Sequence, residues 1–185
     1  MEIRRPASVL LALTFAASAA GSAPEPKTVA RVDLDRYAGR WYEVARYPNR
    51  FQKRCSGDVV AQYTLRPDGK IDVDNSCRNE SGGEDRSRGI ARNASTDGSN
   101  SKLKVRFAPR VLSWLPFVWA NYWILALADD YGYAVVGTPD REYLWILSRT
   151  PTLPEPVLAQ LEKLVEAQGY DAARLERTKH SAPAR

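Results

Sequence analysis

Hydrophobic and polar residues alternate along much of the chain, which is the pattern of strands with one buried face. Between residues 59 and 65 every odd position is apolar, and the even positions from 62 onward are polar. Residues 67–69, Pro-Asp-Gly, are a turn signal, because proline presets φ and glycine tolerates positive φ. The alternation then resumes over residues 71–74. We therefore predict a β-hairpin in which Tyr63 faces Val73 and the odd-numbered apolar residues share one face.

Further short strands are predicted on both sides of this hairpin. The first begins near Gly39, and the others cover residues 88–94, 102–107, 122–128, 133–137 and 143–148. Eight short strands separated by polar or glycine-rich turns are typical of an antiparallel sandwich or barrel. The sequence therefore predicts an all-β domain.

One helix is predicted after the last strand. Thr152 and Glu155 have the spacing of a capping box, with threonine at the N-cap. Apolar residues then repeat at helical spacing, and Gly169 supplies a stop signal. We expect the apolar stripe to pack on the outside of the sheet, over residues such as Leu144 and Ile146.

Residues 1–23 are predicted to be a secretory signal peptide. Basic residues precede a short apolar run, small residues follow it, and cleavage is expected somewhere from Ala19 to Ala23. The run is too short to span a bilayer, and a buried N-terminal helix is the alternative. Residues 24–32 would then form a loose leader. Because this segment contains no cysteine, we expect export without a lipid anchor.

Charge and cysteine content narrow the classes of partner. The 27 basic and 22 acidic residues are interleaved, so the net charge of +5 does not form the continuous basic stripe that nucleic-acid binding requires. Cys55 and Cys77 are the two cysteines of the chain, and one disulfide or two free thiols are possible. A straight hairpin would hold these cysteines too far apart, so a disulfide requires a bend at Ser56 and Gly57. No zinc-ligand spacing is present, and we expect no metal and no cofactor.

Three short motifs carry a resemblance to a known family. Gly39-Arg40-Trp41-Tyr42, the Asp129-Asp130-Tyr131 turn and Arg149 at the end of the last strand resemble the three signatures of the lipocalins. The stretches around residues 41–46 and 143–151 are similar to the bacterial lipocalin and apolipoprotein D subgroup. This resemblance implies an eight-stranded antiparallel up-and-down barrel over residues 33–178, with a tail at 179–185, in a periplasmic or secreted protein. It further implies that Gly39, Trp41, Asp130 and Arg149 close one end, with the Arg149 guanidinium over the Trp41 ring.

A barrel of eight strands leaves room for one small ligand. We expect a fatty acid, a lysophospholipid or a similar lipid to bind there, in a role in envelope lipid maintenance. Taking Trp41 as inward, the predicted ligand-binding residues are Glu43, Tyr47, Tyr63, Val73, Asn75, Phe107, Trp123, Leu125 and Trp145. Four of them, Tyr63, Asn75, Trp123 and Trp145, are assigned by the resemblance. Glu43 either disfavours an anionic headgroup or has a buried structural partner.

Two rival classes stay open beside the ligand carrier. In the first, the inward side chains fill the barrel and the protein is structural or an interaction module. In the second, the barrel is catalytic. We expect no enzyme and no catalytic residue, because the single histidine is His180 in the tail and a disulfide would leave no thiolate.

The segment from Pro109 to Ala120 is unusually apolar for a loop. Its predicted portal residues are Trp114, Leu115, Phe117 and Trp119. We expect a lid at the cavity mouth that also touches a membrane surface. A dimer contact is the alternative, so the protein is expected to be a monomer or a homodimer.

Overall fold

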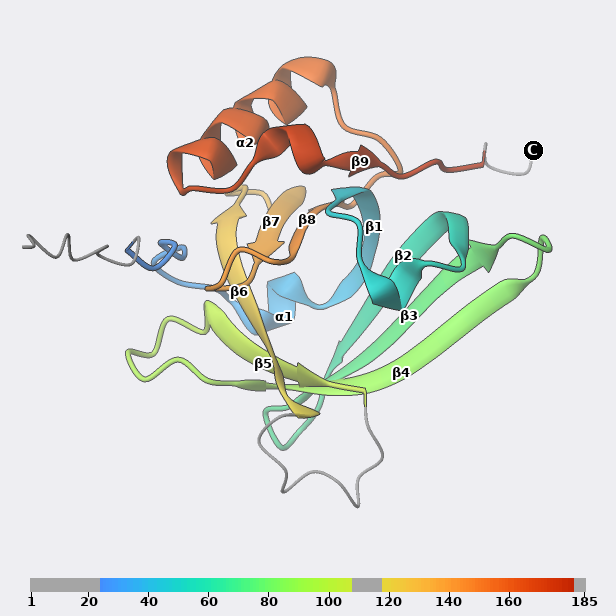
Figure 1. Ribbon diagram of the computed structural model, residues 1–185. Helices are drawn as coiled ribbons and strands as arrows, with labels where there is room; N and C mark the ends of the chain where they lie inside the picture. Colours follow the sequence, from blue (N-terminus) through green and yellow to red (C-terminus); the bar gives the residue numbers. More distant parts are fainter. Residues whose placement is uncertain (1–23, 108–117, 182–185) are drawn as a thin grey trace, which may run out of the picture.

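The computed structural model describes residues 24–107 and 118–181. Eight antiparallel strands form a closed barrel, because β1 pairs with β2 on one side and with β8 on the other (Figure 1). The strands are β1 (Gly39–Arg46), β2 (Cys55–Leu65), β3 (Ile71–Asn79), β4 (Glu84–Asn93), β5 (Lys102–Arg106), β6 (Ala120–Leu127), β7 (Tyr133–Gly137), β8 (Leu144–Ser148) and the short β9 (Glu176–Arg177), which adds to β1. The all-β barrel predicted from the sequence is confirmed.

The β2–β3 hairpin has the predicted register. Tyr63 pairs with Val73, and the Arg66 amide donates to the Lys70 carbonyl oxygen across the turn at 2.8 Å. Gly69 takes the positive φ of 75° that this turn requires. Two register shifts between Cys55 and Val60 supply the predicted bend.

Two β-bulges reverse which side chains face inward. One lies in β1 between Glu43 and Ala45, and the other lies in β6 between Ile124 and Ala126. An extra residue in one strand shifts the alternation by one position. On β1, Glu43 therefore pairs with the inward Leu147, whereas Ala45 pairs with the outward Ile146.

Buried apolar residues form two separate clusters, one inside the barrel and one outside it. The inner cluster contains Val32, Tyr37, Trp41, Tyr63, Ile71, Val73, Ala91, Leu103, Ile124, Ala134, Val136 and Leu147. The outer cluster joins β1, β6, β7 and β8 to the long helix. The sheet is thus apolar on both faces where the helix covers it.

Helix α2 (Glu155–Ala167) lies outside the barrel, across strands β6 to β8 (Figure 1). Leu158, Leu161 and Val165 pack against Leu144 and Ile146, as predicted. The predicted start is wrong: the N-cap is Pro154, and no side chain caps the helix. Pro156 lies in the first turn, where the amide hydrogen that proline lacks would have no acceptor within the helix. The stop is confirmed, because Gly169 has a φ of 83° directly after the C-cap.

Residues 24–38 are more ordered than the predicted leader. The Val29 amide donates to the Ile124 carbonyl oxygen, the Val32 amide donates to the Ser99 carbonyl oxygen, and the Val32 side chain is fully buried. The expectation of a loose segment at 24–32 is therefore wrong for these residues. A four-residue helix, α1 (Leu34–Tyr37), follows, and its amides are capped by Asp33.

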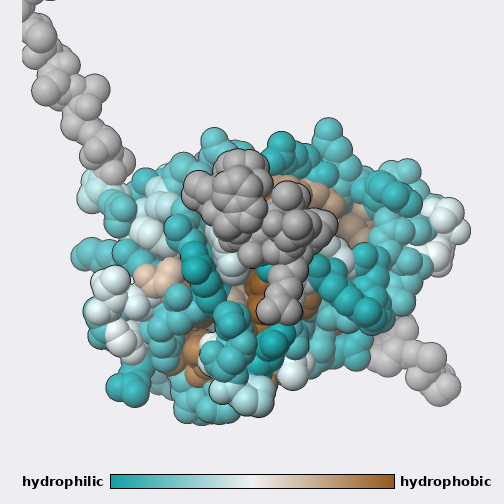
Figure 2. All heavy atoms as spheres, turned by 90° about the horizontal axis from the view of Figure 1, so that it is seen from below, coloured by the Kyte–Doolittle hydropathy of each residue, from teal (hydrophilic) through white to brown (hydrophobic). Residues whose placement is uncertain are grey.

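The surface of the described chain is mainly polar. Figure 2 shows one face on which hydrophilic residues predominate and hydrophobic ones are visible in the hollows between them. With 13 residues, α2 is shorter than a bilayer span, and no described helix meets the length and hydropathy of one.

Candidate functional site

One end of the barrel is closed by the residues that carry the family resemblance. Trp41 is fully buried, and the Arg149 guanidinium carbon lies 3.8 Å from its ring centroid. Gly39 has a φ of 97°, and a Cβ there would lie 3.3 Å from Arg149. Asp130 accepts a hydrogen bond from the Gly132 amide at 2.8 Å and so shapes the turn between β6 and β7.

The Arg149 side chain also binds the backbone beneath the tryptophan. Its guanidinium donates to the carbonyl oxygens of Arg36 at 2.7 Å, Arg40 at 2.8 Å and Ala38 at 2.9 Å. The Trp41 indole donates to the Tyr37 carbonyl oxygen at 2.8 Å. These carbonyls belong to α1, to the residue that joins it to β1 and to the start of β1, so Arg149 fixes the segment that plugs the barrel.

Above this plug, three tyrosine hydroxyls form a chain. The Tyr122 hydroxyl oxygen lies 2.7 Å from that of Tyr37 and 3.1 Å from that of Tyr63. Burial raises the pKa of Tyr63 to about 12, and burial raises the pKa values of Tyr37 and Tyr122 well above the usual value for tyrosine. All three phenols are therefore neutral at physiological pH.

A polar group interrupts the inner wall on the side of β1. The Glu43 carboxylate, 3% exposed, accepts hydrogen bonds from Gln52 and Thr178 at 2.5 Å and from Arg46 at 3.1 Å. Gln52 in turn accepts a hydrogen bond from the Trp145 indole at 3.1 Å. Both carboxylate oxygens thus have protein partners, which matches the structural alternative for Glu43.

Two further inner-wall residues, one on β3 and one directly after β5, are incompletely surrounded by protein groups. Asn75 lies two residues after Val73 on the inner face of β3, and its buried amide oxygen has no hydrogen-bond donor among the described residues. Phe107 continues the inner face of β5, where its ring lies over Gly89, and it is nevertheless 44% exposed. Val73, Asn75, Phe107 and Trp145 therefore face the interior, as predicted.

Three predicted ligand-binding residues lie on the wrong side of the wall. Tyr47, Trp123 and Leu125 belong to the outer cluster beneath α2. The bulge in β1 turns Tyr47 outward, and its hydroxyl donates to the Asp171 carbonyl oxygen at 2.9 Å. In β6, the apolar residues that face inward are Tyr122 and Ile124.

The predicted portal loop is described only at its end. Trp114, Leu115 and Phe117 lie outside the described residues. The Trp119 ring contacts two cations, with its centroid 4.4 Å from the Arg92 guanidinium carbon and 5.0 Å from that of Arg106.

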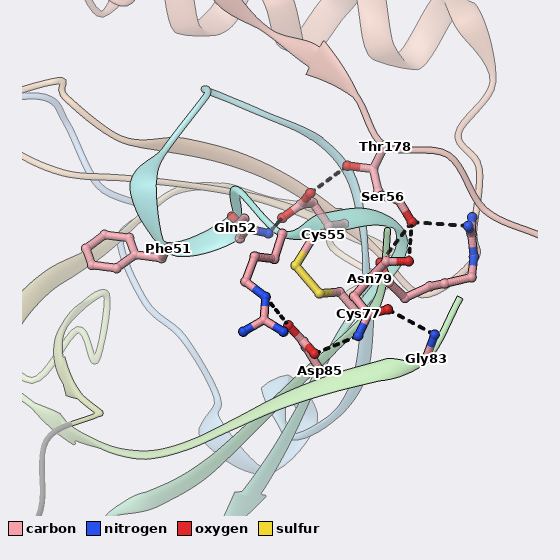
Figure 3. The surroundings of a disulfide bond; sticks show 12 residues. Phe51, Gln52, Cys55, Ser56, Cys77, Asn79, Gly83, Asp85 and Thr178 are labelled. Carbon is pink, nitrogen blue, oxygen red and sulfur yellow. Dashed lines mark hydrogen bonds and ion pairs between the residues drawn. A yellow bond between two sulfur atoms is a disulfide. The ribbon is translucent and has the colours of Figure 1, made fainter. Parts of the chain in front are cut away.

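Cys55 and Cys77 form the disulfide, with Cα atoms 5.6 Å apart. Figure 3 shows that it joins the start of β2 to β3, beside the Asn79–Asp85 hydrogen bond of 2.8 Å. Because Gln52 precedes Cys55 by three residues, the disulfide also fixes the loop that presents Gln52 to Glu43.

Sequence reasoning missed four residues of the interior. Tyr37, Gln52, Tyr122 and Thr178 all contribute polar atoms there. The spacing of Tyr122 and Ile124 could have indicated that both face inward. The neighbouring positions of β6 are also apolar, however, so the alternation does not identify the inner face. The other three come from α1, from a single 3-10 turn at Arg50–Gln52 and from the tail, all too short to show a periodic pattern. Within residues 24–107 and 118–181, no group of acidic, histidine or cysteine side chains could hold a metal ion.

Comparison with known proteins gives a consistent result. The model of the lipocalin-like domain matches residues 32–180. Temperature-induced lipocalin-1 of Arabidopsis thaliana is 43% identical over 159 residues, covering 85% of this chain and 84% of that protein. Outer membrane lipoprotein Blc of Escherichia coli is 35% identical, covering 89% and 94%, and mouse apolipoprotein D is 30% identical, covering 85% and 82%. The solved structure of insecticyanin from Manduca sexta has a TM-score of 0.67 at 24% identity, covering 87% of each chain, and supports the fold.

Proposed function

Because the chain belongs to the lipocalin family, we propose that it binds a small hydrophobic molecule inside the barrel and carries or stores it. The expected ligands are lipids such as a fatty acid or a lysophospholipid, and the expected role is lipid maintenance in a cell envelope. The relatedness to an outer membrane lipoprotein and to apolipoprotein D supports this class of ligand and location.

The observation that carries the proposal is the incomplete inner wall. The Phe107 ring faces inward and is 44% exposed, and the buried Asn75 amide oxygen has no partner among the described residues. Leaving a buried acceptor unpaired costs about 1–3 kcal/mol. A bound amphipathic molecule would cover the ring and offer the amide oxygen a donor directly or through water. A barrel filled by its own side chains would explain neither.

The polar wall favours a neutral or zwitterionic ligand over an anion. Glu43 places a negative charge on the inner face, and the Arg46 guanidinium beside it donates to that carboxylate and to Thr178 through Nη1, while its buried Nε has no partner among the described residues. An anionic headgroup at the same level would therefore meet a carboxylate and a single cation that is already paired with it. Among the two headgroups considered, a zwitterionic lysophospholipid fits better than a fatty acid anion.

The proposal includes no catalysis. His180 is the single histidine, and its Nε2 lies 2.8 Å from the Glu43 carbonyl oxygen and its Nδ1 lies 3.9 Å from Asp58. Both cysteines of the chain are in the disulfide. These contacts support structural roles for His180 and for the two cysteines, which are residue types that can provide a catalytic base or a nucleophile.

The tryptophans allow the interior to be tested directly. We expect lysophosphatidylcholine with a brominated acyl chain to quench tryptophan fluorescence, because the bromine atoms would come close to Trp145 on the inner wall. Trp145→Phe should lose a larger share of the quenchable signal than Trp123→Phe, the matched control on the outer face. Equal losses, or no quenching at all, would contradict binding inside the barrel. Extraction of the purified protein with organic solvent and mass spectrometry would then identify the natural ligand.

We further propose that residues 1–23 direct export and are removed. The disulfide and the relatedness to an outer membrane lipoprotein support this assignment. The proposed location is a periplasm or the outside of the cell.

A further inference from the structure

The three tyrosines above the closed end carry one hydroxyl hydrogen that is not donated in a hydrogen bond between them. Two hydrogen bonds link the hydroxyls of Tyr37, Tyr122 and Tyr63, at 2.7 Å and 3.1 Å. Three hydroxyls carry three hydrogens, so one hydrogen has no acceptor among the described residues. Each hydroxyl oxygen can also accept two hydrogen bonds, so lone pairs are left as well.

The surroundings of these hydroxyls are apolar. Tyr37 and Tyr63 stack at 5.9 Å between ring centroids, and Tyr122 meets the Tyr63 ring edge-on at 6.2 Å. The side chains packed with them include Ile71, Val73 and Leu103. A hydroxyl hydrogen without an acceptor is costly in such a place, because no water-like environment replaces the missing bond.

The hydroxyl chain can be reached from the barrel interior. Tyr37 and Tyr63 are buried, but Tyr122, the middle member of the chain, keeps part of its surface exposed. Tyr122 pairs with Leu103 on β5, and Ile124, which follows it on the same face of β6, pairs with Val136 on β7. All four side chains belong to the inner cluster. Tyr122 is therefore the member of the chain through which we expect the proposed ligand to reach the hydroxyls.

Resting on the proposed function, we infer that the hydroxyls of Tyr37, Tyr63 and Tyr122 form an anchor for an uncharged oxygen atom at the leading end of the ligand. The ligand class is an apolar molecule whose deeply inserted end carries a carbonyl or hydroxyl group, such as a long-chain ketone, alcohol or oxygenated acyl chain. A carbonyl accepts the spare hydroxyl hydrogen, and a hydroxyl also donates to a free lone pair.

A carboxylate fits this anchor poorly. The charged groups that influence it are Glu43, whose negative charge raises the pKa of Tyr63, and Arg149, whose positive charge lowers it. Arg149 lies across the Trp41 ring, and its guanidinium hydrogens are donated to backbone carbonyls. A carboxylate at the anchor would therefore lose its hydration without gaining a cation.

The test compares two probes of similar shape, 2-undecanone and 1-chloroundecane, as competitors of the oxygen-free fluorophore N-phenyl-1-naphthylamine. The wild-type protein should bind the ketone about tenfold more tightly than the chloride, as expected for one additional hydrogen bond. Tyr122→Phe should abolish this preference and leave the affinities of the chloride and the fluorophore within twofold. Tyr133→Phe, which alters a tyrosine packed outside the barrel, is the matched control and should keep the preference.

Tyr122→Leu serves as a second variant if Tyr122→Phe does not fold, because Tyr63→Phe would leave the Tyr122 hydroxyl and a spare hydrogen in place. The infrared C=O stretch of bound 2-undecanone, labelled with 13C, gives an independent measurement. It should lie at lower frequency in the wild-type protein than in either variant, because hydrogen bonding weakens the carbonyl bond. Equal affinities for the two probes, or a preference that survives in both variants, would overturn the anchor. Failure of the fluorophore to bind would instead refute the proposed function.

Discussion

Arg149 shows how much of the closed end depends on the shape of one side chain. Its planar guanidinium covers the Trp41 ring at 3.8 Å and at the same time reaches three backbone carbonyl oxygens between residues 36 and 40. A lysine ammonium is a point charge with three hydrogens and cannot stack flat on a ring while reaching several acceptors. The requirement is therefore for the guanidinium and not merely for a positive charge.

We predict that Arg149→Lys lowers the free energy of unfolding by roughly 2–3 kcal/mol, because hydrogen bonds from a charged donor to several backbone carbonyls are lost together with the stacking on Trp41. Urea denaturation monitored by tryptophan fluorescence would measure this loss. Arg177→Lys is the control, since Arg177 is half exposed and forms a surface ion pair with Glu155. Its effect should stay within about 0.5 kcal/mol. A loss at Arg149 no larger than at Arg177 would contradict the assigned role.

At the level of single residues, the sequence predicts which positions are buried better than which face they occupy. Short motifs or clean alternation mark the closed-end residues and Tyr63. The sequence predicts the wrong face for Trp123 and Leu125, because β6 is apolar on both faces and alternation cannot then distinguish the inner face from the outer one. It predicts the wrong face for Tyr47, because a single bulge reverses the alternation and no residue type marks that bulge.

At the level of elements, the strands and the hairpin register follow from the sequence, whereas the seam between β1 and β2 does not. These strands pair only from Gly39 to Tyr42, and the chain segment around β9 bridges them further along. The Thr178 amide donates to the Val44 carbonyl oxygen, and the Asp58 amide donates to the Lys179 carbonyl oxygen. The tail crosses the sheet so closely that a Cβ at Gly57 would lie 2.5 Å from the Lys179 carbonyl oxygen. Such long-range contacts leave no periodic signal.

Asp58 is the charged group that holds this tail to β2. Its carboxylate accepts hydrogen bonds from Arg78 at 2.7 Å and from the Ser181 amide at 2.6 Å and hydroxyl at 2.8 Å, and His180 lies 3.9 Å away. The hydrogen bond from Arg78, followed by that from the Ser181 amide, lowers the pKa of Asp58 to about 2. A carboxylate with a lowered pKa stabilises the fold above its unfolded pKa of about 3.9, and this contribution is lost as the pH falls towards 2.

We therefore predict that wild-type protein is more stable than Asp58→Asn at pH 6 and that the difference shrinks between pH 4 and pH 2. Urea midpoints measured across this range test the prediction, and Asp129→Asn corrects for the general loss of one surface charge. Hydrogen exchange should show the amide of Ser181 less protected in Asp58→Asn than in the wild type at pH 6. A stability difference that does not change with pH would refute the role of the carboxylate.

At the level of the whole molecule, the proposed export and the disulfide depend on each other. The disulfide joins residues 22 positions apart and fixes the loop that carries Gln52 towards Glu43. Closing a loop of this length stabilises a protein by about 3 kcal/mol in the chain-entropy account. Such a bond forms in oxidising compartments, whereas in a cytosol the two cysteines stay reduced. The full stability of the barrel is thus expected only after the chain has left the cytoplasm.

This dependence can be measured in a bacterial host by comparing the full chain with residues 24–185. The full chain should be recovered from the periplasm, start after a residue between Ala19 and Ala23 by mass spectrometry, and show no thiol that reacts with Ellman's reagent. Residues 24–185 made in the cytosol should show two reactive thiols and unfold with a free energy about 3 kcal/mol lower. In the double variant Cys55→Ser and Cys77→Ser, the periplasmic and the cytosolic protein should have the same lower stability, because no disulfide can form in either compartment. If the full chain stays in the cytosol at its original mass, the proposed signal peptide is wrong, whereas equal stability of the two wild-type forms would show that the disulfide does not support the barrel.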